Sequence, residues 1–147
     1  ITKRMSHVLY NKIVAKLDHL NEYLGYLKVL QKINKKAFLE DYHHFGLAER
    51  YLQLSIEVVL DIAKLFVARL ELPKPDSNQE FIFILRNAKI ISKKTAERVE
   101  GIIGFRNVLV HDYEKIDRTI IYEKLQTRLD DFVVFRKEIM AYLKKNY

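Results

Sequence analysis

The spacing of apolar residues is the feature that most restricts how this chain can fold. These residues recur every three or four positions almost from end to end, which is the period of a helix with one buried face. Only four glycines and two prolines interrupt the 147 residues, and the sequence shows no convincing strand pattern. The chain is therefore predicted to be all-α, with residues 1–147 forming a single domain built as an antiparallel helical bundle.

Prolines set the end of the longest predicted helix. We expect a first helix over about residues 7–30 and a second over about 36–70, in which Gly46 marks a bend. Pro73 and Pro75 end the second helix, because proline lacks an amide hydrogen and disfavours helical geometry in the residue before it.

Capping residues define the remaining helices, which brings the expected number to about five. Ser77 and Glu80 have the spacing of a capping box, so a helix is predicted over about residues 78–90. Ser92 and Asp117 are the expected N-caps of the last two helices, the second of which runs nearly to the end of the chain.

Composition limits the chemistry and the partners. There is no cysteine, which excludes disulfides, thiolate metal sites and cysteine nucleophiles. No stretch approaches the roughly 20 apolar residues that span a bilayer, so a cytoplasmic protein without membrane contact is expected. The net charge of +7 favours an anionic partner, and leaves RNA, DNA, nucleotides and acidic proteins open.

Residues 101–113, GIIGFRNVLVHDY, bring an arginine, an asparagine, a histidine and a tyrosine close together beside an otherwise apolar run. On a continuous helix Arg106 and Tyr113 would lie within roughly 20° of each other, and Asn107 and His111 would share a neighbouring face. Arg106 and His111 would be roughly 140° apart. The helix is therefore expected to end nearby, or a second copy of the chain must contribute.

The segment from Arg106 to Tyr113 resembles the signature of the HEPN domain family, with an Arg-x4-His-x-Tyr pattern. More narrowly it resembles the HepT-like toxins of MNT/HEPN toxin–antitoxin pairs. Residues 48–63, AERYLQLSIEVVLDIA, are similar to the long second helix of that family, and the likeness extends over about residues 47–135.

The resemblance implies a homodimeric, metal-independent endoribonuclease toxin that needs no cofactor and cleaves RNA. It also implies a nucleotidyltransferase (MNT-type) antitoxin that adenylylates the motif tyrosine. Carried over by position, Arg106 and His111 are catalytic, Asn107 supports them or binds substrate, and Tyr113 is the modified residue.

Elementary chemistry is compatible with these roles. Cleavage of RNA by its own 2′-hydroxyl needs a base, an acid and positive charge beside the phosphorus. His111 can transfer a proton near neutral pH, and Arg106 offers a planar set of donors to phosphate oxygens. Asn107 could fix the imidazole tautomer or contact RNA. Since one histidine cannot easily be acid and base in one step, two facing copies would explain how one motif does both.

Two other functions stay open. The chain could be a non-catalytic HEPN subunit that binds a nucleotide or presents substrate to a nucleotidyltransferase, or a purely structural helical adaptor. Arg106 and His111 could also simply bind the terminal carbonyls of a helix. The sequence has no glycine-rich phosphate loop and no acidic metal cluster, so the nucleotidyltransferase activity itself is assigned to the partner.

Four further residues bear on the same segment. Gly101 and Gly104 predict the close approach of another backbone, within the chain or from a second copy, because glycine in a helix costs roughly 1 kcal/mol relative to alanine. Glu57 and Asp61 could form a carboxylate pair, but a solvated face or pairing with Arg106 is favoured.

Histidine and lysine pairs have simpler explanations. His43 and His44 could be taken for a metal site, but adjacent residues point to different faces of a helix, so no metal is expected. Lysine pairs could follow a phosphate backbone, although most are expected to be solvated. These pairs are 35–36, 93–94 and 144–145.

Overall fold

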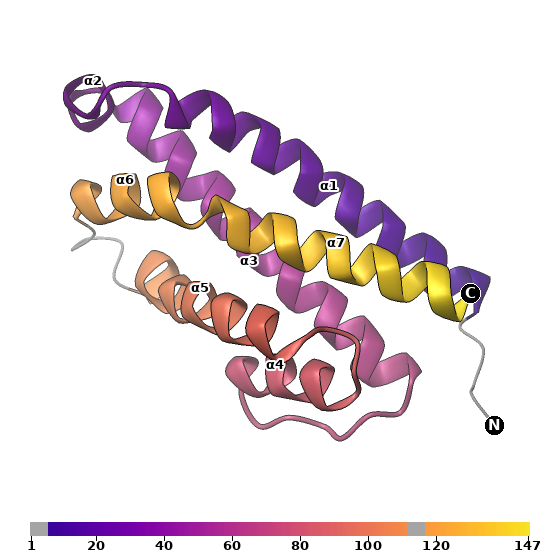
Figure 1. Ribbon diagram of the computed structural model, residues 1–147. Coiled ribbons are helices and arrows are strands. Elements are labelled where there is room, and N and C mark those ends of the chain that lie inside the picture. The colour runs from indigo at the N-terminus through magenta and orange to yellow at the C-terminus, as the bar shows by residue number, and fades with distance from the viewer. Residues whose placement is uncertain (1–5, 112–116) are drawn as a thin grey trace.

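The computed structural model describes residues 6–111 and 117–147, and this part of the chain consists of helices joined by short loops (Figure 1). The helices are α1 (His7–Gln31), α2 (Lys35–Glu40), α3 (Tyr42–Arg69), α4 (Asn78–Asn87), α5 (Lys93–His111), α6 (Arg118–Thr127) and α7 (Leu129–Asn146). The described residues contain no strand, so the predicted all-α class is confirmed.

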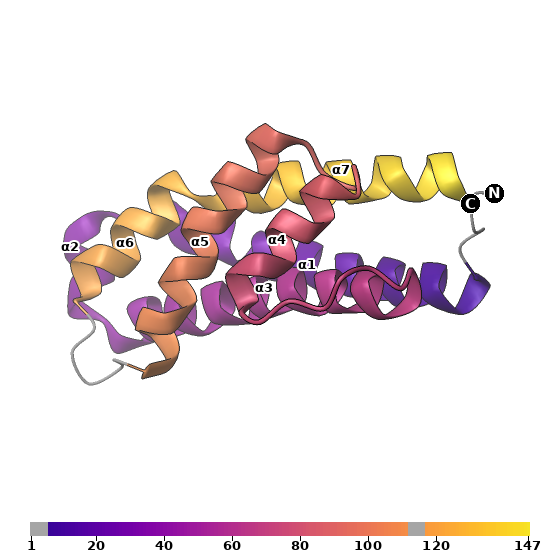
Figure 2. The same cartoon turned by 90° about the horizontal axis from the view of Figure 1, so that it is seen from below.

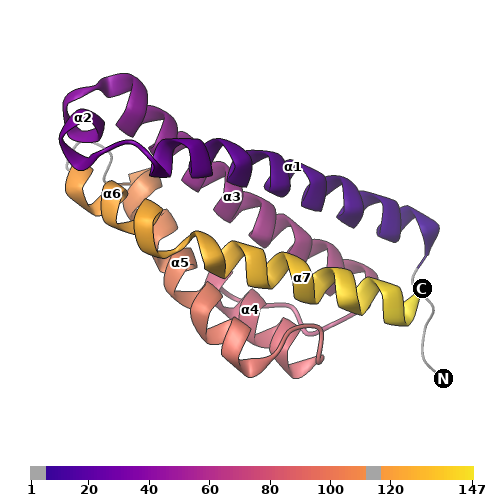
Figure 3. The same ribbon diagram turned by 45° about the horizontal axis from the view of Figure 1, so that its top comes forward.

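Two long antiparallel helices form the spine of the bundle. α1 and α3 pack along their length, and α6 and α7 follow each other beside them (Figures 1 and 3). α4 and α5 pack together on the other side, with α5 against both α3 and α7 (Figure 2). The largest fully buried side chains of the shared core include Phe38, Phe66, Phe132 and Phe135.

The three predicted N-caps are confirmed. Ser77 Oγ accepts a hydrogen bond from the Glu80 amide at 3.4 Å. Ser92 Oγ accepts one from the Thr95 amide at 3.1 Å, and Asp117 Oδ1 accepts one from the Thr119 amide at 2.8 Å. Each cap satisfies an amide that the helix itself leaves free, which is typically worth about 1 kcal/mol.

The predicted second helix is in fact two helices. Asp41 has extended backbone angles (φ −107°, ψ 113°), and its carboxylate accepts a hydrogen bond from the His43 amide at 2.9 Å. Asp41 thus ends α2 and caps α3, whereas Gly46, the expected bend, lies inside α3. Aspartate competes for backbone amides and so favours a cap over a helix interior.

The predicted last helix is also divided, so the described residues form seven helices rather than about five. The interruption is at Arg128 (φ −115°, ψ −2°), where neither glycine nor proline is present. α4 is shorter than predicted and ends at Asn87, because Lys89 adopts a left-handed conformation (φ 60°). The Ile90 amide then bonds to the Leu85 carbonyl at 2.9 Å, which completes a Schellman-type helix end.

None of the described helices is both long enough and apolar enough to cross a bilayer.

Candidate functional site

The motif lies at the C-terminal end of α5. Arg106, Asn107 and His111 belong to one continuous helix, and His111 is its last residue. The side chain of His111 and the whole of Tyr113 lie outside the described residues. The roles predicted for these two residues therefore stay predictions.

Arg106 is half-buried and has no counter-ion among the described residues. Its Nε atom is buried and has no hydrogen-bond partner there either. A buried donor without a partner is unfavourable by about 1–3 kcal/mol, and such groups in native structures often mark a functional site. Within the described residues the charge of Arg106 therefore has no partner.

Glu57 and Asp61 are engaged elsewhere, so of the two favoured alternatives, a solvated face or pairing with Arg106, the pairing is wrong. Asp61 Oδ2 lies 3.1 Å from Lys16 Nζ. Glu57 accepts a hydrogen bond of 3.3 Å from the side-chain amide of Gln53. α3 therefore does not neutralise the motif arginine.

Helix geometry separates the two predicted catalytic residues within one chain. Because α5 is continuous from Arg106 to His111, these two backbone positions lie about 140° apart around the helix axis. Asn107 is exposed on the next position of the helix. One copy of the helix therefore does not direct Arg106 and His111 to the same point by backbone geometry alone.

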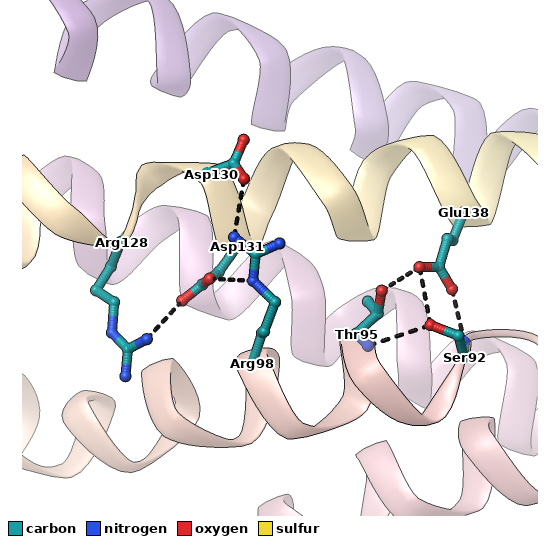
Figure 4. A network of polar contacts seen from close by, with 7 residues as sticks. All are labelled: Ser92, Thr95, Arg98, Arg128, Asp130, Asp131 and Glu138. Carbon is teal, nitrogen blue, oxygen red and sulfur yellow. Dashed lines mark hydrogen bonds and ion pairs between the residues drawn. The ribbon is translucent and has the colours of Figure 1, made fainter.

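At the N-terminal end of α5, hydrogen bonds to Glu138 join this helix to α7 (Figure 4). Glu138 Oε1 accepts a hydrogen bond from the Ser92 amide at 2.6 Å, and Oε2 accepts one from Ser92 Oγ at 3.1 Å. The Thr95 hydroxyl also donates to Oε2. A carboxylate from a distant helix thus completes the cap of α5, where the positive end of the helix dipole favours negative charge.

One turn further along α5, Arg98 forms ion pairs with two aspartates of α7 (Figure 4). Its Nη2 lies 2.8 Å from Asp130 Oδ2, and its Nε lies 2.9 Å from the buried Asp131 Oδ1. These hydrogen bonds, the Asp130 bond foremost, raise the pKa of Arg98 above its ordinary value. Arg128 Nη1 lies 3.5 Å from the other Asp131 oxygen, so two arginines neutralise one buried carboxylate.

The sequence analysis did not single out this network. Asp131 and Glu138 lie more than 30 residues from their α5 partners, and nothing local marks them as buried or bonded. Only the packing of α5 on α7 brings these groups together.

The two glycines of α5 do not meet another backbone among the described residues. A methyl group at Gly101 would come within 3.1 Å of Arg128 Nη2, and one at Gly104 within 3.8 Å of the side-chain nitrogen Nε2 of Gln79. For the described residues, the prediction of a close backbone contact inside the chain is therefore wrong. Gly101 leaves space for the Arg128 guanidinium, and a contact with a second copy stays a prediction.

His43 and His44 have local partners. His43 Nδ1 lies 3.1 Å from Asp41 Oδ1, and His44 Nδ1 lies 3.1 Å from the Ala37 carbonyl oxygen. Within the described ranges no group of three or more histidine, aspartate or glutamate side chains is arranged to hold a metal ion.

Fold and site together define an all-α bundle in which one helix carries an arginine without a counter-ion among the described residues and ends at a histidine. A comparison with protein families gives a more specific result. The sequence model of the family described as Ribonuclease HepT-like matches residues 17–139. The chain therefore belongs to the HepT-like ribonuclease family, which confirms the endoribonuclease class that the sequence predicted.

Curated relatives are similar to this chain over much of its length. A tRNA nuclease HepT from Aphanizomenon flos-aquae is 27% identical over 131 residues, which are 89% of this chain and 89% of that protein. An mRNA nuclease HepT from Shewanella oneidensis is 29% identical over 90 residues, 61% of this chain and 68% of that protein.

Solved structures share the fold. The tri-AMPylated HEPN toxin of Shewanella oneidensis, in complex with its MNT antitoxin, superimposes with a TM-score of 0.80 at 23% identity. That match covers 93% of this chain and 99% of the toxin. YutE from Bacillus subtilis superimposes with a TM-score of 0.79 at 21% identity, covering 92% of this chain and 90% of YutE.

Proposed function

We propose that this chain, as a single HEPN-like domain, is the ribonuclease toxin of a toxin–antitoxin pair and cleaves RNA without a metal ion. Arg106 binds the phosphate at which the chain is cut, His111 transfers protons, and Asn107 supports the histidine or the substrate. The active form is a homodimer, and an MNT-type antitoxin silences it by adenylylating Tyr113.

The observation that carries this proposal is that Arg106, whose buried Nε has no hydrogen-bond partner, has no counter-ion among the described residues and lies inside a segment that belongs to the HepT-like family. A charge left without a described counter-ion has little value for folding, but it suits a phosphoryl group whose negative charge increases in the transition state. A guanidinium is also permanently charged and can donate two parallel hydrogen bonds to phosphate oxygens.

The helix geometry supports a dimer. The 2′-hydroxyl must lose a proton while the 5′-oxygen gains one, and two histidines do this more readily than one. Because Arg106 and His111 diverge around α5, a second α5 facing the first would bring the arginine of one copy towards the histidine of the other. The two-fold symmetry of a homodimer supplies such an arrangement.

The relatives support the substrate and the partner. Two of them are named as nucleases of tRNA and of mRNA, which makes RNA the proposed substrate here. The Shewanella oneidensis neighbour is an AMPylated HEPN toxin in complex with an MNT antitoxin. An AMP group on Tyr113 would add bulk and negative charge close to Arg106 in the sequence, and would compete with the RNA phosphate.

The test is RNA cleavage by mass-verified, unmodified protein in excess EDTA. Wild type is compared with Arg106→Ala, His111→Ala and the matched control Arg50→Ala, which removes an exposed arginine of α3. We expect wild type and the control to release 2′,3′-cyclic phosphate ends, and the two motif variants to lose at least about 100-fold in rate. Equal activity in all four proteins would reject the catalytic assignment and favour the binding-subunit alternative.

Regulation is tested by intact mass after incubation with the cognate antitoxin and ATP. We expect added AMP on wild type and on Tyr42→Phe, a control at an exposed tyrosine, but none on Tyr113→Phe. Added AMP that persists on Tyr113→Phe would place the modification elsewhere.

A further inference from the structure

A cleft of about 540 Å³ opens where the end of α4, the start of α5 and the second half of α7 meet. It lies at the opposite end of α5 from the motif. Its rim carries four basic residues from three segments of the chain: Arg86, Lys89, Lys93 and Lys145. The sequence analysis singled out two of them only as members of lysine pairs, and it did not single out Arg86 or Lys89.

These four cations are not neutralised by the fold. None of them forms an ion pair with a carboxylate in the described ranges. Lys89, Lys93 and Lys145 are exposed, and the Arg86 guanidinium lies over the Phe83 ring at 5.2 Å. Gathering like charges without counter-ions is unfavourable, so the cleft favours an anionic ligand.

The one acidic residue of the cleft is already engaged. Glu138 accepts hydrogen bonds from the Ser92 amide, the Ser92 hydroxyl and the Thr95 hydroxyl, so its charge is directed to the N-terminus of α5 (Figure 4). These bonds also fix the backbone beside Lys93. Glu138 therefore positions one edge of the cleft and does not balance the lysines.

The wall of the cleft suits a nucleotide unit. Ile90, Ile91 and Ala141 give it an apolar lining, and Tyr142 adds a half-buried ring. Burial raises the pKa of the Tyr142 phenol, so the ring carries no negative charge where the lysines are charged. Aromatic and apolar surfaces beside cations are the elements that bind single-stranded nucleic acid without sequence preference.

Lys89 occupies a conformation that costs stability. Its φ of 60° is left-handed, and the C′ position of a helix end usually holds glycine there. A lysine at this position presents its amino group to the cleft at the expense of backbone strain. Strained residues of this kind often belong to binding sites.

We infer that this cleft is a second RNA-binding site, which holds phosphates of the substrate at a distance from the bond that is cut. This inference rests on the proposed ribonuclease function. Ser92 and Arg106 are fourteen residues apart along α5, which is about 21 Å at about 1.5 Å per residue. A stacked strand that rises about 3.4 Å per nucleotide needs about six nucleotides to connect the two sites.

RNA fits the cleft better than a free nucleotide does. Free nucleotides are usually bound in enclosed pockets with a few precisely placed polar groups. Here the cations are long side chains on the rim of an open cleft, which suits contacts to successive backbone phosphates.

The test compares two double variants with the same loss of charge. The cleft pair is Lys89→Gln with Lys93→Gln. The matched control pair is Lys12→Gln with Lys64→Gln, which removes two lysines from another cleft, of about 610 Å³, between α1 and α3. Binding is measured by anisotropy with a 2′-O-methyl RNA of about twenty nucleotides, which lacks the attacking hydroxyl, over a series of salt concentrations.

We expect the cleft pair to bind this RNA about tenfold more weakly at low salt, with a salt slope smaller by about two. It should cut an RNA of about four nucleotides as well as wild type does, because that substrate is too short to reach the cleft. The control pair should match wild type in both assays. Equal losses in the two pairs, no loss in either, or equal losses on short and long RNA would each overturn the inference.

Two further outcomes have separate meanings. A wild-type protein that neither binds nor cuts RNA would reject the proposed function itself, whereas normal RNA cleavage with no effect of the cleft pair rejects only the second site. ATP binding measured by calorimetry covers the other source of phosphate. If the cleft pair loses ATP binding and keeps RNA binding, the cleft belongs to a free nucleotide and the inference is wrong.

Discussion

Arg98 and Arg106 stand eight residues apart on the same helix and have opposite surroundings. Arg98 forms ion pairs with Asp130 and Asp131 of α7. Arg106 has a buried Nε with no hydrogen-bond partner, and no described carboxylate faces its charge. The same side chain thus serves the fold at one end of α5 and is left available for a ligand at the other.

This difference shows how one helix can be both an anchor and a site. The N-terminal half of α5 is fixed to α7 by Glu138 and by the Arg98 ion pairs, which sets the position of the whole helix. The C-terminal half can then carry an unbalanced charge without losing its place. Groups that bind phosphate need such a rigid support to be preorganised for a transition state.

The largest expected effect comes from replacing each of the two arginines by alanine in turn. Arg106→Ala should lower the rate of RNA cleavage by about 100-fold or more while the thermal midpoint of unfolding changes little. Arg98→Ala should lower the thermal midpoint of unfolding. At a temperature where this variant is folded, its rate of RNA cleavage should stay within a few-fold of the wild-type rate. Cleavage assays and thermal unfolding on both proteins check this, and similar behaviour of the two variants would contradict the comparison.

Asp131→Asn should lower the free energy of unfolding of the protein by about 2 kcal/mol. The buried carboxylate faces Arg98 and Arg128, and removing its charge leaves Arg98 with Asp130 alone and takes from Arg128 its counter-ion among the described residues. Both arginines are partly exposed, so water offsets part of the loss. Urea denaturation measures the effect, with Asp130→Asn as the control, because that exposed carboxylate should cost less than about 1 kcal/mol.

Lys89→Gly should separate stability from RNA binding at the cleft. Glycine accepts the left-handed conformation without strain, so we expect a gain of up to about 1 kcal/mol in stability together with weaker binding of long RNA. Glu71→Gly is the matched control at a second described residue with a left-handed conformation, φ 54°, and should leave the binding of long RNA unchanged. Unchanged RNA binding by Lys89→Gly would remove Lys89 from the site.

The smallest expected effect is that of pH on the binding of long RNA, which should be close to zero. The cleft uses lysine and arginine, which stay charged, and the raised pKa of Tyr142 keeps its phenol neutral to more alkaline pH. The stability that burial of the neutral phenol contributes is present below the ordinary tyrosine pKa and is lost only as the pH rises through the raised value. Binding of long RNA to His111→Ala should therefore be constant between about pH 6 and 9, while wild-type cleavage changes with pH. A binding midpoint near neutral pH would point to another titrating group.

Local chemistry in the sequence was enough for the all-α class and for the starts of three helices. The apolar period gave the all-α class, and Ser77, Ser92 and Asp117 cap helices where predicted, because a capping bond joins residues only two or three positions apart. The break at Asp41 also has a local cause, because aspartate is a good N-cap and accepts a hydrogen bond from the His43 amide. The motif from Arg106 to Tyr113 could be found because it is contiguous in the chain.

Tertiary structure alone decided which charges are balanced. Sequence patterns were sufficient to predict an all-helical chain, a basic surplus and a HEPN-like segment, but they left open whether the carboxylates of α3 pair with Arg106 or face solvent. In the folded protein Asp61 binds Lys16, Asp131 binds Arg98, and Arg106 is left without a described partner. Ion pairing depends on distances of a few ångströms between residues far apart in sequence, which are fixed only when the helices pack.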